Sequence, residues 1–190
     1  MIYERIIGRR TIRKYLQREA PREALVKCVD AARLSPCGSN LQGLKYLVID
    51  EPDLLERVFA TLKWAGYLPS YGHEPTEKPK AYIVILLDRA IRKDPGHDAG
   101  IAAMSISLVA HDEGLGSCIL GSIDRDKLRI ALNIPIGLEI VLVVSLGYPA
   151  ETSIAEAMIG DNVKYWLDDN GTLHVPKRPL ESIMWWNRFA

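Results

Sequence analysis

The residues with the clearest capacity for chemistry lie near the start of the chain, in the stretch Arg9-Arg10-Thr11-Ile12-Arg13. A guanidinium group is always charged, and its planar fork of donors matches two phosphate oxygens at once. Three such groups and a hydroxyl within five residues could therefore bind a phosphate. The same cluster, taken alone, is also typical of a basic surface that faces water. The rest of the sequence has to distinguish these two interpretations.

The composition limits the classes of partner. The chain has 190 residues, of which 48% are hydrophobic and 25% charged, so we expect a single domain over residues 1–190 with one well-buried core. Lys and Arg together number 24, as do Asp and Glu, and the formal net charge is zero. A neutral protein lacks the electrostatic footprint of a general nucleic-acid binder. Any bound anion must therefore be met by a local cluster of cations.

The cysteines and histidines form no recognisable disulfide or metal pattern. Cys28, Cys37 and Cys118 are odd in number and far apart, which predicts free, reduced thiols. The four histidines are scattered, so we expect no metal site. The N-terminus lacks the apolar core of a signal peptide, and no stretch of about 18 residues is apolar and uncharged. We expect a soluble, cytoplasmic protein with no membrane partner.

Hydrophobic spacing predicts the elements that position these residues. Helices are expected over residues 2–8, 21–34, 52–62, 97–113 and 124–132, and buried strands over 46–49, 81–87 and 139–146, with a short apolar segment at 117–120. Pro21 and Pro52 suit the first position of a helix, where a missing N–H costs nothing. Asp124 is expected to cap the last helix.

The predicted helix over 97–113 has the strongest pattern in the chain. Its large residues Ile101, Met104 and Leu108 share one spacing, and small residues fill the positions between them. A helix that is apolar or small nearly all round usually lies at the centre of a fold.

Two long segments have no hydrophobic period. Residues 64–80 are rich in aromatics, Gly and Pro, and we expect a loop or lid there. Trp64, Tyr67 and Tyr71 are candidates for the wall of a substrate pocket, although they could equally contact a partner subunit. Residues 164–190, with three of the four tryptophans, are expected to be irregular.

The alternation of strands and helices favours, by itself, a parallel doubly wound sheet. No predicted strand is followed by a Gly-x-Gly-x-x-Gly turn or a P-loop, so the usual nucleotide cradles are absent. There is also no Gly-x-Ser-x-Gly elbow, which argues against an α/β-hydrolase.

Four stretches resemble the motifs of the FMN-dependent nitroreductase family. They are, in order, Arg9–Arg13, Ser35–Gln42, Gly114–Gly121 and Pro176–Glu181, and they span nearly the whole chain. The resemblance implies an α+β fold with a mixed, mainly antiparallel sheet flanked by helices, in place of the parallel sheet. It also implies an interlocked homodimer with two FMN molecules at the interface, each held by residues of both subunits.

The resemblance assigns FMN contacts to residues from all four stretches. They are Arg9, Arg10, Thr11, Arg13, Pro36, Cys37, Gly38, Asn40, Gln42, Ile119, Leu120, Gly121, Ser122, Lys177 and Arg178. Arg9 with Lys177 or Arg178 would hold the phosphate. Thr11 would donate to phosphate or ribityl oxygens, and Arg10 would serve phosphate or ring. Arg13 would lie over the N1 and C2 edge of the ring, where a cation stabilises the charge of the reduced form.

Two of these stretches would contact the flavin ring itself. Amides such as Asn40 and Gln42 both donate and accept, as the uracil-like edge requires, and in the family this loop comes from the second subunit. The segment 116–121 would present backbone N–H groups to the ring, one of them to N5. Cys37 and Gly43 depart from the serine and proline that are usual in the family, and Cys118 is expected to be a packing residue.

The resemblance implies an oxidoreductase that takes hydride from NADH or NADPH at flavin N5. The acceptor would be a nitroaromatic, a quinone or a free flavin, in a ping-pong sequence. No catalytic acid is assigned because the proton can come from solvent; Asp98, Asp112, Glu113 and Glu139 are expected to be surface or capping acids. Two alternatives stay open: a flavin storage or sensor protein without turnover, and a specialised dehalogenase, dehydrogenase or flavin-destroying enzyme of the same fold.

Overall fold

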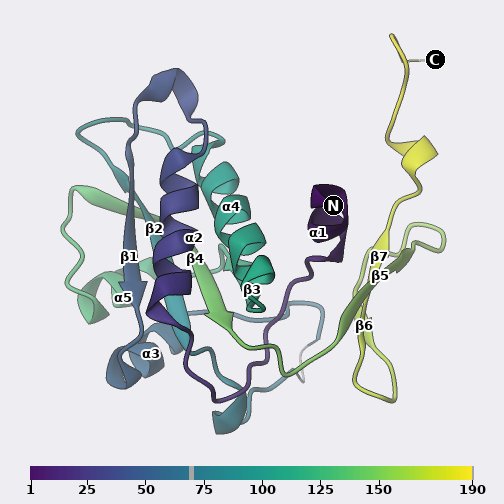
Figure 1. The fold of residues 1–190 in the computed structure, drawn as a ribbon, viewed down its shortest axis with the longest axis horizontal. Coiled ribbons are helices and arrows are strands. Elements are labelled where there is room, and N and C mark those ends of the chain that lie inside the picture. Colours follow the sequence, from purple (N-terminus) through teal and green to yellow (C-terminus); the bar gives the residue numbers. More distant parts are fainter. Residues whose placement is uncertain (69–70, 190) are drawn as a thin grey trace.

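The computed structural model describes residues 1–68 and 71–189, and its centre is a four-stranded sheet (Figure 1). The strands are β1 (Leu44–Ile49), β2 (Ala81–Asp88), β4 (Leu138–Gly147) and β3 (Gly116–Leu120), in that spatial order. Each neighbouring pair is antiparallel. The strand predictions at 81–87 and 139–146 are confirmed, and β1 begins two residues earlier than expected.

Helices cover both faces of this sheet. They are α2 (Arg22–Leu34) and α4 (Asp98–Asp112) on one face, and α3 (Pro52–Phe59) and α5 (Arg125–Ala131) on the other. Alternate residues of β2 point to opposite faces, because side chains of a strand have a period of two. Ile83 and Ile85 pack with α2 and α4, whereas Val84 and Leu86 pack with α3 and α5. This double burial explains the continuous apolar run of β2.

Helix α4 packs against α2 and the main sheet, which confirms the central position expected for it. In α4 the buried side chains are mostly small, such as Ala102, Ala103 and Ala110, whereas Ile101 is 37% exposed. Small side chains at a contact let helix axes approach closely, so the alanine face packs on α2 and the sheet. Spacing alone indicated a helix here, but residue size decided which face is buried.

The helix boundaries follow local chemistry closely. Pro52 is the first residue of α3, as expected, while Pro21 lies one residue before α2 and caps it. Helix α3 ends at Phe59, so Leu62 lies outside it and pairs with Ile123 in an isolated bridge. The Asp124 carboxylate accepts from the backbone N–H of Lys127 at 3.2 Å, which confirms the predicted cap of α5.

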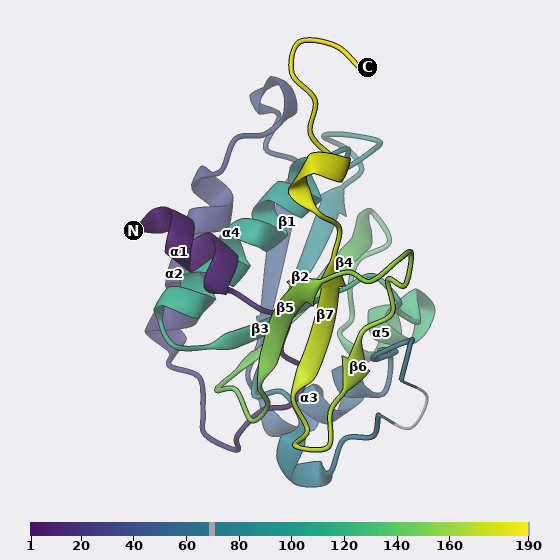
Figure 2. The ribbon, with the colours of Figure 1, turned by 90° about the vertical axis from the view of Figure 1, so that its right-hand side faces the viewer.

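A second, smaller sheet forms an arm beside the main body (Figures 1 and 2). Its strands are β5 (Ser153–Ala157), β7 (Leu173–Lys177) and β6 (Trp166–Leu167), with β5 and β7 parallel. The prediction of an irregular tail over 164–190 is therefore wrong for β6 and β7, while the described residues after β7 contain only one short 3-10 turn. Pro176 lies within β7, and proline inside a short apolar run argues against a strand in sequence reasoning.

The complete fold is a mixed α+β arrangement with mainly antiparallel strands, as the family resemblance implied. The parallel sheet favoured by the alternation of elements is wrong. Burial on both faces makes a strand apolar whatever its direction, so the pattern of β2 and β4 does not report strand direction.

Helix α1 (Ile2–Gly8) is exposed and touches the end of α4 through an Arg5–Asp112 ion pair of 3.2 Å. Among the described residues, no helix has the length and apolarity needed to span a membrane.

Candidate functional site

The basic N-terminal stretch lies where the main sheet meets the arm. Backbone hydrogen bonds hold it: Ile12 N–H donates to Ser117 O at 2.9 Å, and Ala150 N–H donates to Lys14 O at 2.9 Å. The segment thus lies between β3 and the chain that leaves β4 for the arm.

Two glycines of the main sheet make room for this segment. Gly116 and Gly147 face each other across β3 and β4. A Cβ on Gly116 would lie 2.7 Å from Cβ of Ile12, and one on Gly147 would lie 2.9 Å from Cδ1 of Tyr15. Neither distance is possible without movement, so the close approach requires glycine.

We expect Gly116→Ala to destabilise the protein by about 1–3 kcal/mol, since an added methyl group overpacks the contact with Ile12. Urea unfolding measures this loss. The control is Gly137→Ala, because Gly137 has open space at its Cβ position. Equal effects of the two substitutions would show that the Ile12 contact does not impose glycine.

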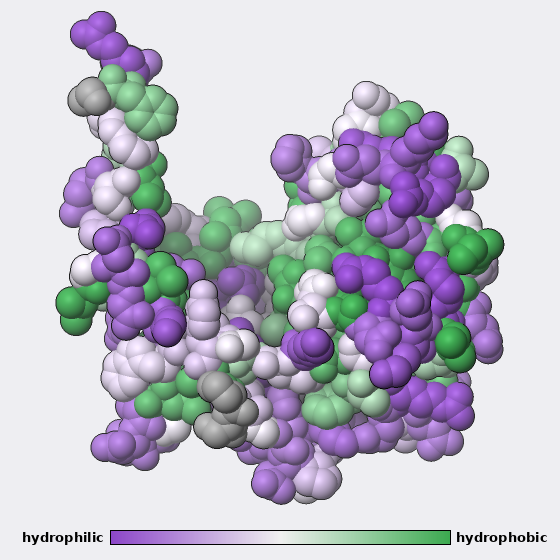
Figure 3. Space-filling model, turned by 180° about the vertical axis from the view of Figure 1, so that it is seen from behind, coloured by the Kyte–Doolittle hydropathy of each residue, from purple (hydrophilic) through white to green (hydrophobic). Residues whose placement is uncertain are grey.

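The structure brings the N-terminal cations together with the arm. Arg9, Arg10, Thr11, Arg13 and Lys177 line one cavity of about 70 Å³. A second cavity of about 350 Å³ shares Arg9, Arg10 and Ser153 with the first. Figure 3 shows, from behind, that the surface is hollowed between the arm and the main body. One end of the predicted site thus forms from residues at opposite ends of the chain.

Two unsatisfied donors show what this cavity suits. Within residues 1–68 and 71–189, Arg9 Nε and Ser153 Oγ are buried without a hydrogen-bond partner. Burial lowers the pKa of Arg9, as does the neighbouring charge of Arg10. A buried donor without a partner costs free energy, and an anion in this cavity would supply the missing acceptor. The residues present therefore fit a phosphate group.

Arg178 does not line these cavities. Its Nη1 lies 3.3 Å from Asp161 Oδ1 on an exposed part of the arm. Of the two C-terminal cations, the geometry favours Lys177 as the phosphate ligand. Arg10 also donates from Nη2 to the carbonyl of Ile7, which leaves the rest of its guanidinium for the cavity.

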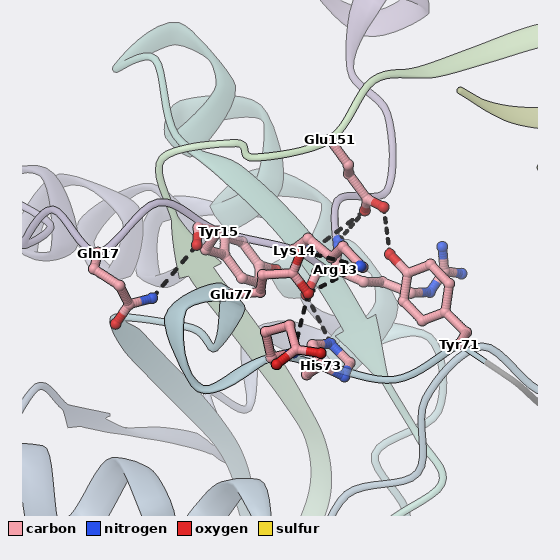
Figure 4. A network of polar contacts seen from close by, with 9 residues as sticks. Arg13, Lys14, Tyr15, Gln17, Tyr71, His73, Glu77 and Glu151 are labelled. Atoms are coloured by element: carbon pink, nitrogen blue, oxygen red, sulfur yellow. Dashed lines mark hydrogen bonds and ion pairs between the residues drawn. The ribbon is translucent and has the colours of Figure 1, made fainter. Parts of the chain in front are cut away.

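The backbone of Arg13 is fixed by a polar network (Figure 4). The Glu151 carboxylate accepts from the N–H of Arg13 and from the hydroxyl of Tyr71. His73 Nε2 lies 2.9 Å from the carbonyl oxygen of Arg13. Lys14 adds an ion pair of 2.9 Å with Glu77. Residues 71–77 are thereby docked onto the basic stretch.

One aromatic ring lies against the Arg13 side chain, and further aromatic contacts run along the 64–73 segment. The Arg13 guanidinium lies 5.0 Å from the ring centroid of Tyr165, which lies 5.0 Å from that of Tyr67. Trp64 instead stacks on Phe59 at 5.5 Å and packs against the core. Tyr67 thus contacts the ring that lies against Arg13, and the Tyr71 hydroxyl bonds the carboxylate that accepts from the Arg13 backbone. A pocket wall made of these aromatic residues stays a prediction. Residues 69–70 of this predicted loop lie outside the described residues.

The loop of residues 36–43 lies elsewhere in the protomer. Pro36, Cys37 and Gln42 line a separate cavity of about 140 Å³ that shares no residue with the Arg9 cavity. Three residues that are not glycine, namely Ser39, Asn40 and Gln42, have φ of 52–53°. Left-handed backbone at such residues costs energy, and it clusters at functional sites.

Asp98 corrects the expectation of a surface acid. Its side chain is buried, accepts from Gly38 N–H at 2.9 Å and pairs with Arg92 at 2.7 Å. Asp112 and Glu113, in contrast, are paired with Arg5 and Lys27 near the surface. Glu139 pairs with Arg89 at 2.7 Å.

Residues at the end of β3 and just after it are exposed. Ile119, Gly121 and Ser122 are exposed, whereas the Leu120 side chain packs in the core, so only its backbone is available to a ligand. Cys118 is buried, and burial raises its pKa to about 11. The thiol therefore stays protonated at neutral pH, in keeping with a packing role.

Sequence reasoning missed three residues of this region: Ser153, Glu151 and Tyr165. Glu151 and Ser153 follow β4 by a few residues, at the point where the chain leaves the main sheet. The only sequence signal for Glu151 and Ser153 was their position shortly after the predicted buried strand over 139–146. Tyr165 lies in a segment without any period, and nothing local marks it.

Two histidines in and beside the site have opposite electrostatic surroundings. His174 Nδ1 donates to the Glu156 carboxylate at 2.7 Å, and this bond, with a weaker contribution from Asp168, raises the pKa of His174 on the arm. Burial lowers the pKa of His73.

We therefore expect NMR titration of the imidazole protons to give a midpoint above about 6.5 for His174 and below it for His73. Because folding raises the pKa of His174, its contribution to stability is complete below about 6.5 and is lost as pH rises through the folded-state value. The stability deficit of His174→Gln should accordingly shrink as pH rises. A deficit that is constant with pH, or the reverse order of midpoints, would contradict this account.

Comparisons with known proteins identify the family of this chain. The family model described as Nitroreductase family matches residues 6–148. A Methanothermobacter thermautotrophicus protein named "Putative NADH dehydrogenase/NAD(P)H nitroreductase" is 33% identical over 157 residues, covering 79% of this chain and 78% of that protein. An iodotyrosine deiodinase of Thermotoga neapolitana is 22% identical over 165 residues, covering 78% of this chain and 89% of that protein.

A solved structure gives the same answer for the fold. The crystal structure from Desulfovibrio desulfuricans in complex with FMN superposes with a TM-score of 0.73 at 25% identity, covering all of this chain and 98% of the other. The family model, the relative and the shared α+β architecture show that this chain belongs to the nitroreductase family.

Proposed function

We propose that this protein is an FMN-dependent oxidoreductase that accepts reducing equivalents from NADH or NADPH and passes them to an organic acceptor such as a nitroaromatic or a quinone. The observation that carries the proposal is the cation-lined cavity, where Arg9 Nε and Ser153 Oγ lack partners among the described residues. When bound, FMN supplies two-electron redox chemistry at its ring, and the two substrates would use one face in turn.

The phosphate end of FMN would lie among Arg9, Thr11, Ser153 and Lys177. Arg9 offers a charged fork, Lys177 a second cation from the arm, and the two hydroxyls offer neutral donors. Arg10 lies at the same cavity and adds positive charge. An exposed basic surface would keep all its donors hydrated, whereas here Arg9 Nε and Ser153 Oγ are buried away from water.

Arg13 would act on the ring. A fixed guanidinium at the N1 and C2 edge stabilises negative charge there and raises the reduction potential. The contacts of its backbone with Glu151 and His73, and of its side chain with Tyr165, hold it in place before any ligand arrives. Such preorganisation avoids the cost of ordering a long side chain during binding.

The second half of the ring site would come from a partner subunit. Asn40 and Gln42 lie on a loop that shares no cavity residue with Arg9 in one protomer. A homodimer would bring the loop of one subunit to the cations of the other. The exposed apolar side chains at the end of the chain support a dimer, since a surface of this kind favours a protein contact. They include Leu180, Ile183, Trp185, Trp186 and Phe189.

A second candidate is a reductive dehalogenase of the same fold. The observation in its favour is the similarity to iodotyrosine deiodinases, which covers most of this chain. Tyr71, whose hydroxyl is a neutral donor because burial and Glu151 raise its pKa, stands in the predicted pocket wall for either substrate class.

One experiment separates these functions from flavin storage. The purified protein is loaded with FMN and mixed anaerobically with NADH or NADPH while the flavin absorbance is followed. Bleaching, followed by recovery when a nitroaromatic or quinone is added, is the expected result. Recovery with a halogenated phenol alone would favour the dehalogenase, and a flavin that never bleaches would favour a storage protein. A protein that cannot be loaded with FMN would overturn the proposal.

A further inference from the structure

The loop of residues 37–43 has an unusual backbone and few internal restraints. Ser39, Asn40 and Gln42 are all left-handed, and the hydrogen bonds within the loop are local ones such as Asn40 N–H to Cys37 O at 3.1 Å. Local bonds of this kind do not fix a loop relative to the body. Its orientation must depend on contacts with other elements.

One contact anchors each end of the loop. At the far end, Asp88 N–H donates to Gly43 O at 2.9 Å. At the near end, Gly38 N–H donates to Asp98 Oδ1 at 2.9 Å. Asp98 is the first residue of α4, so its carboxylate also lies at the positive end of a helix dipole.

The Arg92 guanidinium lies against the near end of the loop. Arg92 Nη1 pairs with Asp98 Oδ2 at 2.7 Å, and the Arg92 backbone N–H donates to Asp88 O at 3.1 Å. A Cβ on Gly38 would lie 2.8 Å from Arg92 Nη1, and one on Gly96 would lie 2.7 Å from Nη2. The guanidinium therefore occupies the space between Gly38 and Gly96 and packs against the loop.

We propose that the Asp98–Arg92 ion pair is a positioning device for the ring-binding loop, so that Asp98 orients Asn40 and Gln42 although it touches no ligand. The inference rests on the proposed function for the identity of the ligand. A buried carboxylate holds its partners in fixed geometry only while its charge is balanced and its oxygens accept hydrogen bonds. In Asp98 the charge is balanced by Arg92 and by the helix end, and Gly38 N–H donates to one of the oxygens. Removal of either side chain releases the loop.

The first test is hydrogen exchange, which needs no ligand. In Asp98→Asn the acceptor for Gly38 remains but the charge that holds Arg92 is lost; in Arg92→Gln the opposite partner is removed. Both variants should exchange the amides of residues 38–41 about tenfold faster than the parent, because a charge-assisted hydrogen bond has been weakened. The amides of Ile83, Val84 and Ile85 in β2 should be unchanged. The matched control is Glu139→Gln, which breaks the nearby Arg89–Glu139 pair of 2.7 Å.

The second test is the release of FMN from the loaded protein, followed by the rise of flavin fluorescence on dilution. Asp98→Asn and Arg92→Gln should release FMN about tenfold faster, while Glu139→Gln should release it at the parental rate. Unchanged exchange in the 38–41 amides in both variants would overturn the inference. So would unchanged FMN release from a protein that binds FMN. If the parent binds no FMN but the loop amides respond as expected, the proposed function fails and the anchoring role stands.

Discussion

Arg9→Ala is expected to weaken FMN binding on the order of 100-fold. Each charge-assisted hydrogen bond contributes about 1.5–3 kcal/mol, and a tenfold change in affinity corresponds to about 1.4 kcal/mol. Arg9 Nε is already buried without a partner, so the cost of removing it from water has been met during folding. Calorimetric titration of the flavin-free protein with FMN measures the change.

Two controls make this test specific. Arg5→Ala removes the same charge from the neighbouring helix. Arg5 is exposed and already paired with Asp112, so water and salt screen its charge, and the affinity should stay nearly the same. At the other end of the chain, Lys177→Ala should weaken binding while Arg178→Ala should not, because Arg178 faces Asp161. Equal losses in both members of either pair would show that the overall positive charge, and not the cavity, binds the phosphate.

Tyr15→Ala is expected to cost about 3–5 kcal/mol of stability, the range for emptying the site of a buried aromatic side chain. Tyr15 is fully buried against Gly147, and its hydroxyl contacts the carbonyl of Ile12 and Ser145 Oγ, the latter at 2.8 Å. Its ring therefore holds the segment that carries Arg13 onto the sheet. Chemical denaturation measures the loss.

Tyr15→Phe is the matched variant, because it keeps the ring and removes only the hydroxyl. It should cost about 1–2 kcal/mol, since one partner of a buried hydrogen bond is lost. FMN affinity should fall more in Tyr15→Ala than in Tyr15→Phe. If the two variants were equally stable, the ring would contribute nothing to the attachment of this segment.

Local patterns in the sequence predicted the elements of the body well. The apolar runs at 81–87 and 139–146 are strands, and the Asp124 cap begins a helix, because each depends on neighbours in sequence. Strand direction and the buried face of α4 could not be predicted in this way. They depend on which distant elements pack together, and the alanine face of α4 meets α2 and the sheet.

The candidate site likewise contains residues that local sequence predicts and residues that only the three-dimensional packing identifies. A cluster as dense as Arg9–Arg13 is visible in any reading of the sequence, and the family motif added Lys177. Ser153 and Glu151 became visible only in three dimensions, since a lone serine and a lone glutamate after a strand have no distinctive spacing. The role of Asp98 was misjudged because burial, which sets its function, is not encoded in its immediate neighbours.

The arm gives the anion cavity a consequence for the whole chain. One wall comes from residue 9 and the opposite one from residue 177, at the end of a small sheet beside the main body. An anion bound by both Arg9 and Lys177 would link two points that lie 168 residues apart in the sequence, and would thus close most of the polypeptide into a loop without a covalent bond. Closing a long ring restricts the open ensemble, and a ligand that binds only the closed form stabilises that form by a free energy that grows with the logarithm of ligand concentration. Under the proposed function this anion is the phosphate of FMN, so flavin binding would stabilise the contact between the arm and the main body.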